Sequence, residues 1–221
     1  MKKRLVIFGT GDIAEIAHYY FNHDSDYEVF AFSVDTNFIK EDSFCGLPIV
    51  PFETVDQFYS PDEYYFFIAL SYSKLNSIRK EKYLVAKEKG YKIASYISSH
   101  ATMLNNGNVG ENCFILEDNT VQPFVKIGNN VTLWSGNHIG HHSTVQDHTF
   151  ISSHVVVSGG VDIGEQCFIG VNATLRDHIK VGERCVIGAR SILLSDAAPE
   201  GVYAETTTER SKIPSSRLRG L

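Results

Sequence analysis

Every sixth residue between Met103 and Leu193 is aliphatic, and this period restricts what the second half of the chain can fold into. With 43% of the chain apolar, chance gives such a run of sixteen in one register with a probability on the order of one in a million. The sixteen residues are Met103, Val109, Ile115, Val121, Ile127, Leu133, Ile139, Val145, Ile151, Val157, Ile163, Ile169, Leu175, Val181, Ile187 and Leu193.

A period of six fits neither an α-helix nor a flat alternating strand, and repeats at hexapeptide spacing are typical of a parallel β-helix. Three short faces then close one triangular coil of eighteen residues, with each aliphatic residue pointing into the prism. Coils stack at strand spacing, about 4.8 Å, so residues eighteen apart lie one above another. Seven of the sixteen are followed by Gly, which we expect to permit a tight approach or a bend, at positions 110, 128, 140, 164, 170, 182 and 188.

Length and charge exclude several classes of protein. The 221 residues allow one large domain or two small ones, and a net charge of -6 argues against a general nucleic-acid binder. The longest apolar run near the start, Leu5 to Phe8, is too short for a secretory signal or a membrane span. We therefore expect a cytoplasmic protein that neither spans a membrane nor binds nucleic acid.

Three of the four cysteines share one position of the repeat. Cys113, Cys167 and Cys185 are separated by multiples of eighteen, which predicts a single interior column of small buried side chains. We expect neither a disulfide nor a metal site there, because the spacing follows from the repeat itself.

The N-terminal part begins with a strand over 4–8 and a glycine turn, Gly9 to Ala14. A helix over 14–21 and a second strand over 28–34, ending at Asp35, complete a mononucleotide-binding βαβ unit in outline. The glycines allow close approach of a phosphate to the helix N-terminus, and the acid can accept from a ribose or base. A tight turn that binds no ligand stays open as the alternative.

Further elements follow before the repeat begins. We predict a strand over 64–70, a helix over 75–89, a last strand over 91–97 and a boundary at 98–100. Strand ends of a parallel sheet line the crevice where ligands bind, so residues 9–12, Asp35 and residues 71–74 are expected to face one pocket. Fewer than 100 residues precede the repeat, which favours a single nucleotide, such as that of a nucleotide sugar, over a dinucleotide.

Five of the nine histidines fall between 138 and 154. His142, His148 and His154 occupy one repeat position on three successive faces, so they cannot jointly bind one metal within a subunit, and we predict no metal. His141 lies one position earlier, and Gly159 lies one coil further on. Acyl transfer from a thioester needs a base near neutral pH and a donor for the oxyanion, which an imidazole and a bare backbone amide can provide.

With these motifs in this order, the sequence resembles the left-handed β-helix acyltransferases with an N-terminal nucleotide-sugar domain. Their members acetylate nucleotide-linked 4-amino sugars or sialic-acid-like sugars. The resemblance covers nearly the whole chain and rests on the glycine turn, Asp35, the strand end Ile68-Ala69-Leu70-Ser71 and the hexapeptide array. It implies a left-handed coil, acetyl-CoA as acyl donor, and a homotrimer with active sites between subunits.

The resemblance also implies roles for particular residues. His141 matches the catalytic base, and Gly159 matches the glycine whose N–H binds the thioester carbonyl. The remaining matches are Gly9, Gly11, Asp12, Asp35 and Ser71 for the nucleotide sugar, and Gly159, Val171, Gly188 and Ala189 for acetyl-CoA. Basic residues available for CoA phosphates are Lys180, Arg184, Arg190, Lys212, Arg217 and Arg219.

The chain departs from the family pattern after the base. The family often has Glu or Asp there to orient the imidazole, and this chain has His142, so we expect Asp147 or Asp118 to take that role, if any carboxylate does. The family's Gly-x-Pro-Ala loop near CoA is replaced by residues 202–206 and 211–214.

We therefore predict a Rossmann-like nucleotide-sugar-binding domain over 1–100, a left-handed β-helix acyltransferase domain over 101–198 and a tail over 199–221. The expected activity is acetyl-CoA-dependent N-acetylation of a nucleotide-linked amino sugar, which we expect to be a 4-amino-4,6-dideoxy sugar. The amine attacks directly with a His as general base, and the resemblance implies a part in surface-polysaccharide synthesis. Three alternatives remain: a sugar O-acetyltransferase, a metal lyase of the carbonic-anhydrase type with zinc between subunits, and a non-catalytic nucleotide-sugar-binding protein.

Overall fold

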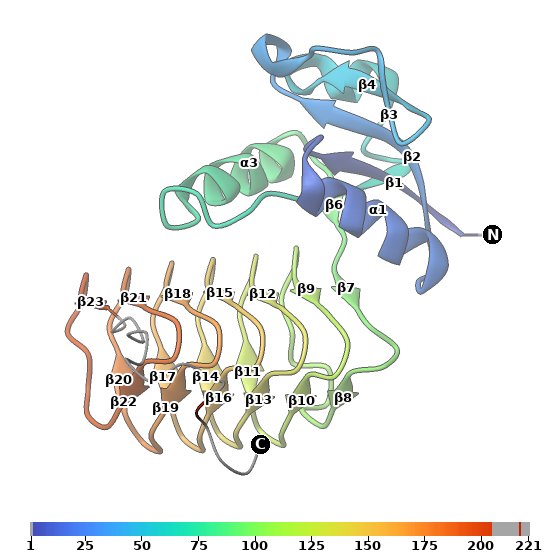
Figure 1. Cartoon of the computed structure of the whole chain (residues 1–221). Coiled ribbons are helices and arrows are strands. Elements are labelled where there is room, and N and C mark those ends of the chain that lie inside the picture. The colour runs from blue at the N-terminus through green and yellow to red at the C-terminus, as the bar shows by residue number, and fades with distance from the viewer. Residues whose placement is uncertain (1, 205–216, 218–221) are drawn as a thin grey trace.

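The computed structural model describes residues 2–204 and residue 217, and it has two parts (Figure 1). An α/β domain at the N-terminus lies along one side of a long coil of short strands. Most of the tail expected over 199–221 falls outside the described residues, including Lys212 and Arg219. None of the described helices is long and apolar enough to cross a membrane.

The N-terminal domain is built on a six-stranded sheet of order β3-β4-β2-β1-β5-β6. Its pairings are parallel except that between β3 and β4. The strands are β1 (Lys3–Phe8), β2 (Tyr27–Val34), β3 (Ser43–Phe44), β4 (Leu47–Pro51), β5 (Tyr64–Ile68) and β6 (Lys92–Ile93). The helices are α1 (Asp12–His23), α2 (Val55–Phe58) and α3 (Ser77–Glu88), with 3₁₀ turns η1 (Thr36–Phe38) and η2 (Phe52–Thr54).

The central strand β1 is buried on both faces. Leu5 and Ile7 pack in one apolar cluster with Phe21 of α1, while Val6 and Phe8 pack in the other with residues of α3. Side chains alternate between the faces of a strand, so a continuous apolar run at 5–8 fits a strand covered by a helix on each side. The predicted strand–helix–strand unit at 4–34 is therefore confirmed in outline, within a sheet that is mixed rather than wholly parallel.

Two details of this domain differ from the sequence prediction. The single strand expected over 91–97 is wrong: β6 ends at Ile93, and β7 (Tyr96–Ile97) pairs with β9 of the coil. The hydrogen bond from Ser95 Oγ to the Gly110 carbonyl helps direct the chain into the coil. The β3–β4 hairpin has no counterpart in the prediction. Its turn has positive φ at both Cys45 and Gly46, as a two-residue type I′ turn requires.

The second part is a three-sided parallel coil, which confirms the structure predicted from the six-residue period. Residues eighteen apart pair in parallel register, for example Val121 with Ile139 and Leu133 with Ile151. The aliphatic ladder fills the interior, where Met103 and Val109 at the open end are partly buried and the other fourteen are buried. The pairing of β7 and of β23 (Val202–Tyr203) extends the coil at its two ends.

Three faces make up the coil, each a parallel sheet of two-residue strands. The first face contains β8 (Thr102–Met103), β10 (Thr120–Val121), β13 (His138–Ile139), β16 (Val156–Val157), β19 (Thr174–Leu175) and β22 (Ile192–Leu193). The second contains β11 (Lys126–Ile127), β14 (Thr144–Val145), β17 (Asp162–Ile163) and β20 (Lys180–Val181). The third contains β7, β9 (Phe114–Ile115), β12 (Thr132–Leu133), β15 (Phe150–Ile151), β18 (Phe168–Ile169), β21 (Val186–Ile187) and β23.

The coil turns at three corners, which we number by the face that precedes each. Every sixth residue from Asn106 to Arg190 has a left-handed backbone, with φ between 54° and 78°. Asn, Asp and His tolerate this conformation better than other residues with a Cβ. This requirement accounts for His142, His148, His154 and His178, all of which occupy the left-handed corner position.

The glycines that follow ladder residues serve a different purpose. A Cβ at Gly140 would lie 2.6 Å from the amide nitrogen of Gly159, and one at Gly164 would lie 2.6 Å from that of Glu183. The predicted tight approach is thus confirmed. The bend itself lies two residues later, at the left-handed position, because φ is not positive at Gly140 or Gly164.

The N-terminal domain is fastened to the third face. The Asn112 side chain accepts from the Ile68 amide at 2.8 Å and donates to the Ile68 carbonyl at 3.3 Å, which joins the end of β5 to the coil. Arg79 of α3 is fully buried and donates to Thr132 Oγ1 and, at 3.5 Å, to the Thr149 carbonyl. Burial lowers its pKa to about 10. These contacts fix the end of β5 and the helix α3 relative to the coil.

Candidate active site

The glycine turn after β1 opens onto a cavity in the N-terminal domain. Gly9 has φ of 122°, and a Cβ there would lie 2.8 Å from the Ala69 carbonyl oxygen, so packing requires glycine. A Cβ at Gly11 would meet nothing within 4 Å, although Gly11 caps α1. The helix N-terminus is therefore open to an anion. Asp12, the first residue of α1, is exposed and lines none of the three cavities near Thr10, Asp35 and Ser71.

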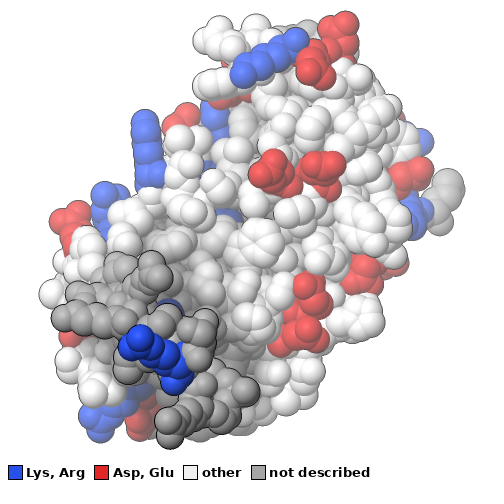
Figure 2. Space-filling model, viewed as in Figure 1, with Lys and Arg blue, Asp and Glu red and all other residues white. Residues whose placement is uncertain are grey.

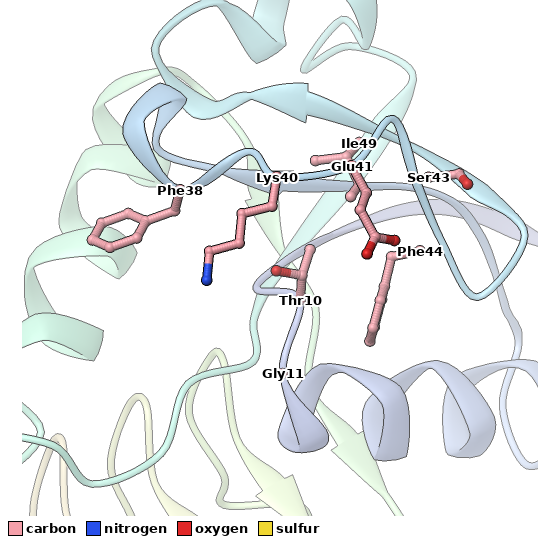
Figure 3. Close-up of a pocket in the computed structure, with 8 residues that line it drawn as sticks. All are labelled: Thr10, Gly11, Phe38, Lys40, Glu41, Ser43, Phe44 and Ile49. Atoms are coloured by element: carbon pink, nitrogen blue, oxygen red, sulfur yellow. The ribbon is translucent and has the colours of Figure 1, made fainter.

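Figure 3 shows this first cavity, of about 450 Å³, with Thr10 and Gly11 beneath the segment that leads into the β3–β4 hairpin. The Lys40 side chain extends into the space between Phe38 and Thr10, and Phe44 closes the side above α1. Lys40 is thus a cation beside an open helix N-terminus. Lining residues are Thr10, Gly11, Phe38, Lys40, Glu41, Ser43, Phe44 and Ile49.

Asp35 lines a second, adjoining cavity of about 280 Å³. Its Oδ1 lies 2.7 Å from Nζ of Lys82, whose side chain is 13% exposed and lies 5.6 Å from the Phe8 ring. Gly9 and Thr10 line the same cavity. Sequence reasoning missed Lys82. Its spacing of four from Ile78, another lining residue, is the only signal that could have found it.

Ser71 lies in a third cavity of about 200 Å³ between the two parts of the chain. Ile13 and Ser71 come from the N-terminal domain, while Trp134, Phe150 and Val171 come from the coil. The expectation of one shared pocket is therefore wrong in part. Gly9 and Asp35 share a cavity, but Ser71 faces another.

His141 and Gly159 are neighbours at the first corner, between the first and second faces. The exposed His141 ring leans over Gly159, such that a Cβ there would lie 2.8 Å from its Nε2. The backbone is pinned by the hydrogen bond from the Gly160 amide to the His141 carbonyl, at 2.8 Å. Within the described ranges, the Gly159 amide donates to no acceptor. An imidazole therefore lies beside a bare, available N–H.

The side chain that orients His141 is another imidazole. Nδ1 of His142 lies 3.1 Å from Nδ1 of His141, so one ring donates and the other accepts. When His141 is the donor, its Nε2 over Gly159 carries the lone pair of a base. Neither expected carboxylate lies beside it: Asp147 accepts from the amide and side chain of Asn129 at the second corner, and Asp118 is at the third.

The histidines at the left-handed positions of the cluster form the corners of the coil. His142, His148 and His154 lie at the first, second and third corners, as the repeat predicts. His148 is buried and accepts from Asn130 Nδ2 at 2.9 Å. No group of three His, Cys, Asp or Glu residues that could hold a metal ion occurs within residues 2–204 and 217.

The residues expected to contact acetyl-CoA lie at the third corner or just before it. Val171 is 42% exposed and stacks below Ala189, since the Arg190 amide donates to its carbonyl at 2.7 Å. The Gly188 amide donates to the Tyr203 carbonyl at 2.7 Å. Within a single chain, the residues expected to contact acetyl-CoA therefore lie at a different corner of the coil from His141 and Gly159.

Charged side chains are scattered over the surface shown in Figure 2, with acidic and basic groups interspersed on both parts of the chain. Of the basic residues considered for CoA phosphates, Arg184 forms an ion pair with Glu200 at 3.2 Å. Lys180 and Arg217 are exposed.

The comparisons with known proteins agree with this architecture. The bacterial transferase hexapeptide family (six repeats) matches residues 106–141, 124–159 and 160–195. A variant of perosamine N-acetyltransferase from Caulobacter crescentus, solved with CoA and GDP-perosamine, has a TM-score of 0.82 at 18% identity, covering 91% of this chain and 93% of that one.

Two further solved structures have the same fold. WeeI from Acinetobacter baumannii AYE has a TM-score of 0.74 at 16% identity, covering 91% of this chain and 96% of that one. The acetyltransferase domain of PglB from Neisseria gonorrhoeae FA1090 has a TM-score of 0.65 at 21% identity, covering 92% and 97%. The matched repeats within residues 106–195 coincide with the three-sided coil, and these solved structures share the fold of nearly the whole chain.

The buried His148 gives a prediction for stability. Burial is the main cause that lowers its pKa from 6.5 to about 4, with Lys80 and Arg79 adding to the effect. The unfolded chain takes up a proton near pH 6.5 and the folded protein only near pH 4, so this residue costs stability as the pH falls through that window.

A His148→Asn variant keeps a residue that suits the left-handed corner, as Asn130 does one coil earlier. We expect its free energy of unfolding in urea to fall less than that of the wild type between about pH 7 and about pH 5. His23→Asn, on the exposed end of α1, is the control. Equal slopes for wild type and His148→Asn would contradict the assignment.

Proposed function

We propose that this protein is an acetyl-CoA-dependent N-acetyltransferase that acts on the amino group of a nucleotide-linked amino sugar. The observation that carries the proposal is the His141 imidazole leaning over the unused Gly159 amide on an outer corner of the coil. Support for the substrates comes from solved structures of the same fold, one of them complexed with CoA and GDP-perosamine and another with acetyl coenzyme A. The cytoplasmic location and the part in surface-glycan synthesis implied by the resemblance belong to this proposal.

In the proposed reaction the neutral amine attacks the thioester carbonyl carbon. A C–N bond forms, and the carbonyl π electrons move to oxygen, where the Gly159 N–H donates to the oxyanion. Nε2 of His141 takes the proton from nitrogen, and the C–S bond then breaks with its electron pair on sulfur. The His142 contact at 3.1 Å holds the His141 ring for this step.

Direct attack needs no acyl-enzyme, and the three cysteines of the coil are unsuited to forming one. Cys113, Cys167 and Cys185 are buried in the coil and free of disulfides. Burial raises the pKa of Cys113 and of Cys167 to about 12, so neither supplies a thiolate at neutral pH.

We assign the nucleotide sugar to a Rossmann-like domain over residues 1–100 and acyl transfer to residues 101–198. Gly9 and Gly11 leave the α1 N-terminus open to the diphosphate, and the two cavities beside them supply Lys40 and Lys82 as cations. Asp35 accepts from a ribose or base. Asp12 and Ser71 complete the proposed set, with Ser71 on the side facing the coil.

The separation between corners favours a homotrimer with sites between subunits. His141 and Gly159 lie at the first corner, and the proposed acetyl-CoA contacts Val171, Gly188 and Ala189 lie at or just before the third. A second copy can bring its third corner to the first corner of its neighbour, and three copies close such a head-to-tail contact.

The assignment of the base predicts a loss of turnover. His141→Ala should lower kcat by about 10²- to 10⁴-fold, because a positioned base contributes that much to proton transfer. Thiol release from acetyl-CoA is measured with a panel of UDP-, GDP- and dTDP-linked amino sugars, and His23→Ala on α1 is the control. Full activity of His141→Ala would remove the base from the proposal.

The same assay separates the close rival, a sugar O-acetyltransferase. Acetylation of a 4-hydroxy sugar in preference to its 4-amino counterpart would favour that rival. Nucleotide-sugar binding without any thiol release would favour a binding protein.

The position of Asp35 predicts an effect on KM for the nucleotide sugar alone. Asp35→Asn should raise KM for the nucleotide sugar by about 10-fold or more, the effect of losing a hydrogen bond to a charged acceptor, and leave KM for acetyl-CoA unchanged. Glu53→Gln is the matched control, since Glu53 accepts from Thr36 nearby but lines neither cavity. A change in KM for acetyl-CoA instead would contradict the assignment.

The subunit arrangement predicts a mass. Sedimentation equilibrium of the active protein should give three times the 24.7 kDa of one chain. A fully active monomer would contradict a site shared between subunits.

A further inference from the structure

The first corner carries two consecutive glycines, Gly159 and Gly160, where the coils on either side carry large residues. His141 and His142 occupy the two positions one coil before, and Asp177 and His178 occupy them one coil after. Because coils stack about 4.8 Å apart, the glycine pair leaves a notch between two walls of side chains.

Two imidazoles converge on this notch from opposite sides. His141 leans forward from the preceding coil, with Nε2 2.8 Å from where a Cβ of Gly159 would be. His178 leans back from the following coil, with Nδ1 2.4 Å from where a Cβ of Gly160 would be. The His178 amide donates to the Gly159 carbonyl at 3.0 Å, which fixes the second histidine to the glycine that bears the free N–H.

The third corner offers a comparison. His154 leans over Gly136 in the same way, with Nδ1 2.5 Å from where a Cβ would be. The residue before Gly136 is Ser135, whose hydroxyl donates to Glu117, so no imidazole faces His154 from the preceding coil. Convergence of two imidazoles therefore distinguishes the first corner from a corner with the same backbone.

We propose that His178 is a second catalytic residue, which protonates the departing sulfur of acetyl-CoA; this inference rests on the proposed function. In the tetrahedral adduct, nitrogen and sulfur point to different sides of the carbon, so base and acid must approach from different directions. His141 on one side of the notch and His178 on the other meet that requirement, and the unused N–H of Gly159 is available for the oxyanion.

His141 Nε2 takes the proton that the amine loses when the C–N bond forms. As the carbonyl reforms, the C–S bond breaks, its electron pair stays on sulfur, and the imidazolium of His178 gives its proton to that sulfur. His141 returns its proton to solvent and His178 regains one, so the products are the N-acetyl sugar and CoA thiol.

The test compares two donors that differ in one atom, acetyl-CoA and its selenium analogue. A selenol is a stronger acid than a thiol and leaves as the anion. With acetyl-CoA, His178→Ala should lower kcat by about 100-fold, the lower end for a general acid. With the selenoester the loss should shrink to about 5-fold or less, whereas the His141→Ala loss should be similar for both donors.

Two variants exclude a purely structural role. His178→Gln keeps a polar side chain that cannot transfer a proton, and it should be as slow as His178→Ala. His154→Ala removes the same kind of imidazole-on-glycine packing at the third corner and should retain wild-type kcat with both donors. Thermal unfolding verifies that all variants are folded.

The outcomes are separable. Equal losses of His178→Ala with both donors, or wild-type activity of His178→Gln with acetyl-CoA, would overturn the role of acid. A wild-type protein that releases thiol from acetyl-CoA with no amino sugar would instead overturn the proposed function, and the inference with it.

Discussion

The hydrogen bonds that join each coil to the next are the interaction on which the rest of this structure depends. Each two-residue strand pairs in parallel with strands eighteen residues away, and the left-handed residue at every corner turns the chain for the next face. The left-handed corners would not fix the fold without the pairing between coils, because a two-residue strand forms too few hydrogen bonds to be stable by itself. Because the coils stack, residues about eighteen apart in the sequence become neighbours in space. This stacking brings His141, Gly159 and His178 together.

Much of this could be predicted from the sequence. The aliphatic ladder fixes the inward position, so the register and the pairing of His141 with Gly159 follow by counting eighteen. The unit β1–α1–β2 is also readable, because a buried strand, a glycine turn and an amphipathic helix leave distinct patterns. Such features are local or periodic, and for that reason a single sequence contains them.

What could not be predicted are contacts between distant segments. The ion pair of Asp35 with Lys82 joins the end of β2 to α3, and no pattern in the sequence relates these two residues to each other. The same holds for Arg79, buried against Thr132. Residues 91–97 read as one strand because most of them are apolar and neither Gly nor Pro interrupts the run, although the hydrogen-bond partners change from β5 to β9 within it.

The corner period has a consequence for how such a chain can change length. Inserting eighteen residues would lengthen the coil by one complete turn, and every later side chain would stay at its original corner or face. Inserting six after Gly160 would keep all apolar residues inside, yet rotate everything downstream by a third of a turn. His178 would then stand on another edge, and a protein equally well packed would have lost one side of its notch.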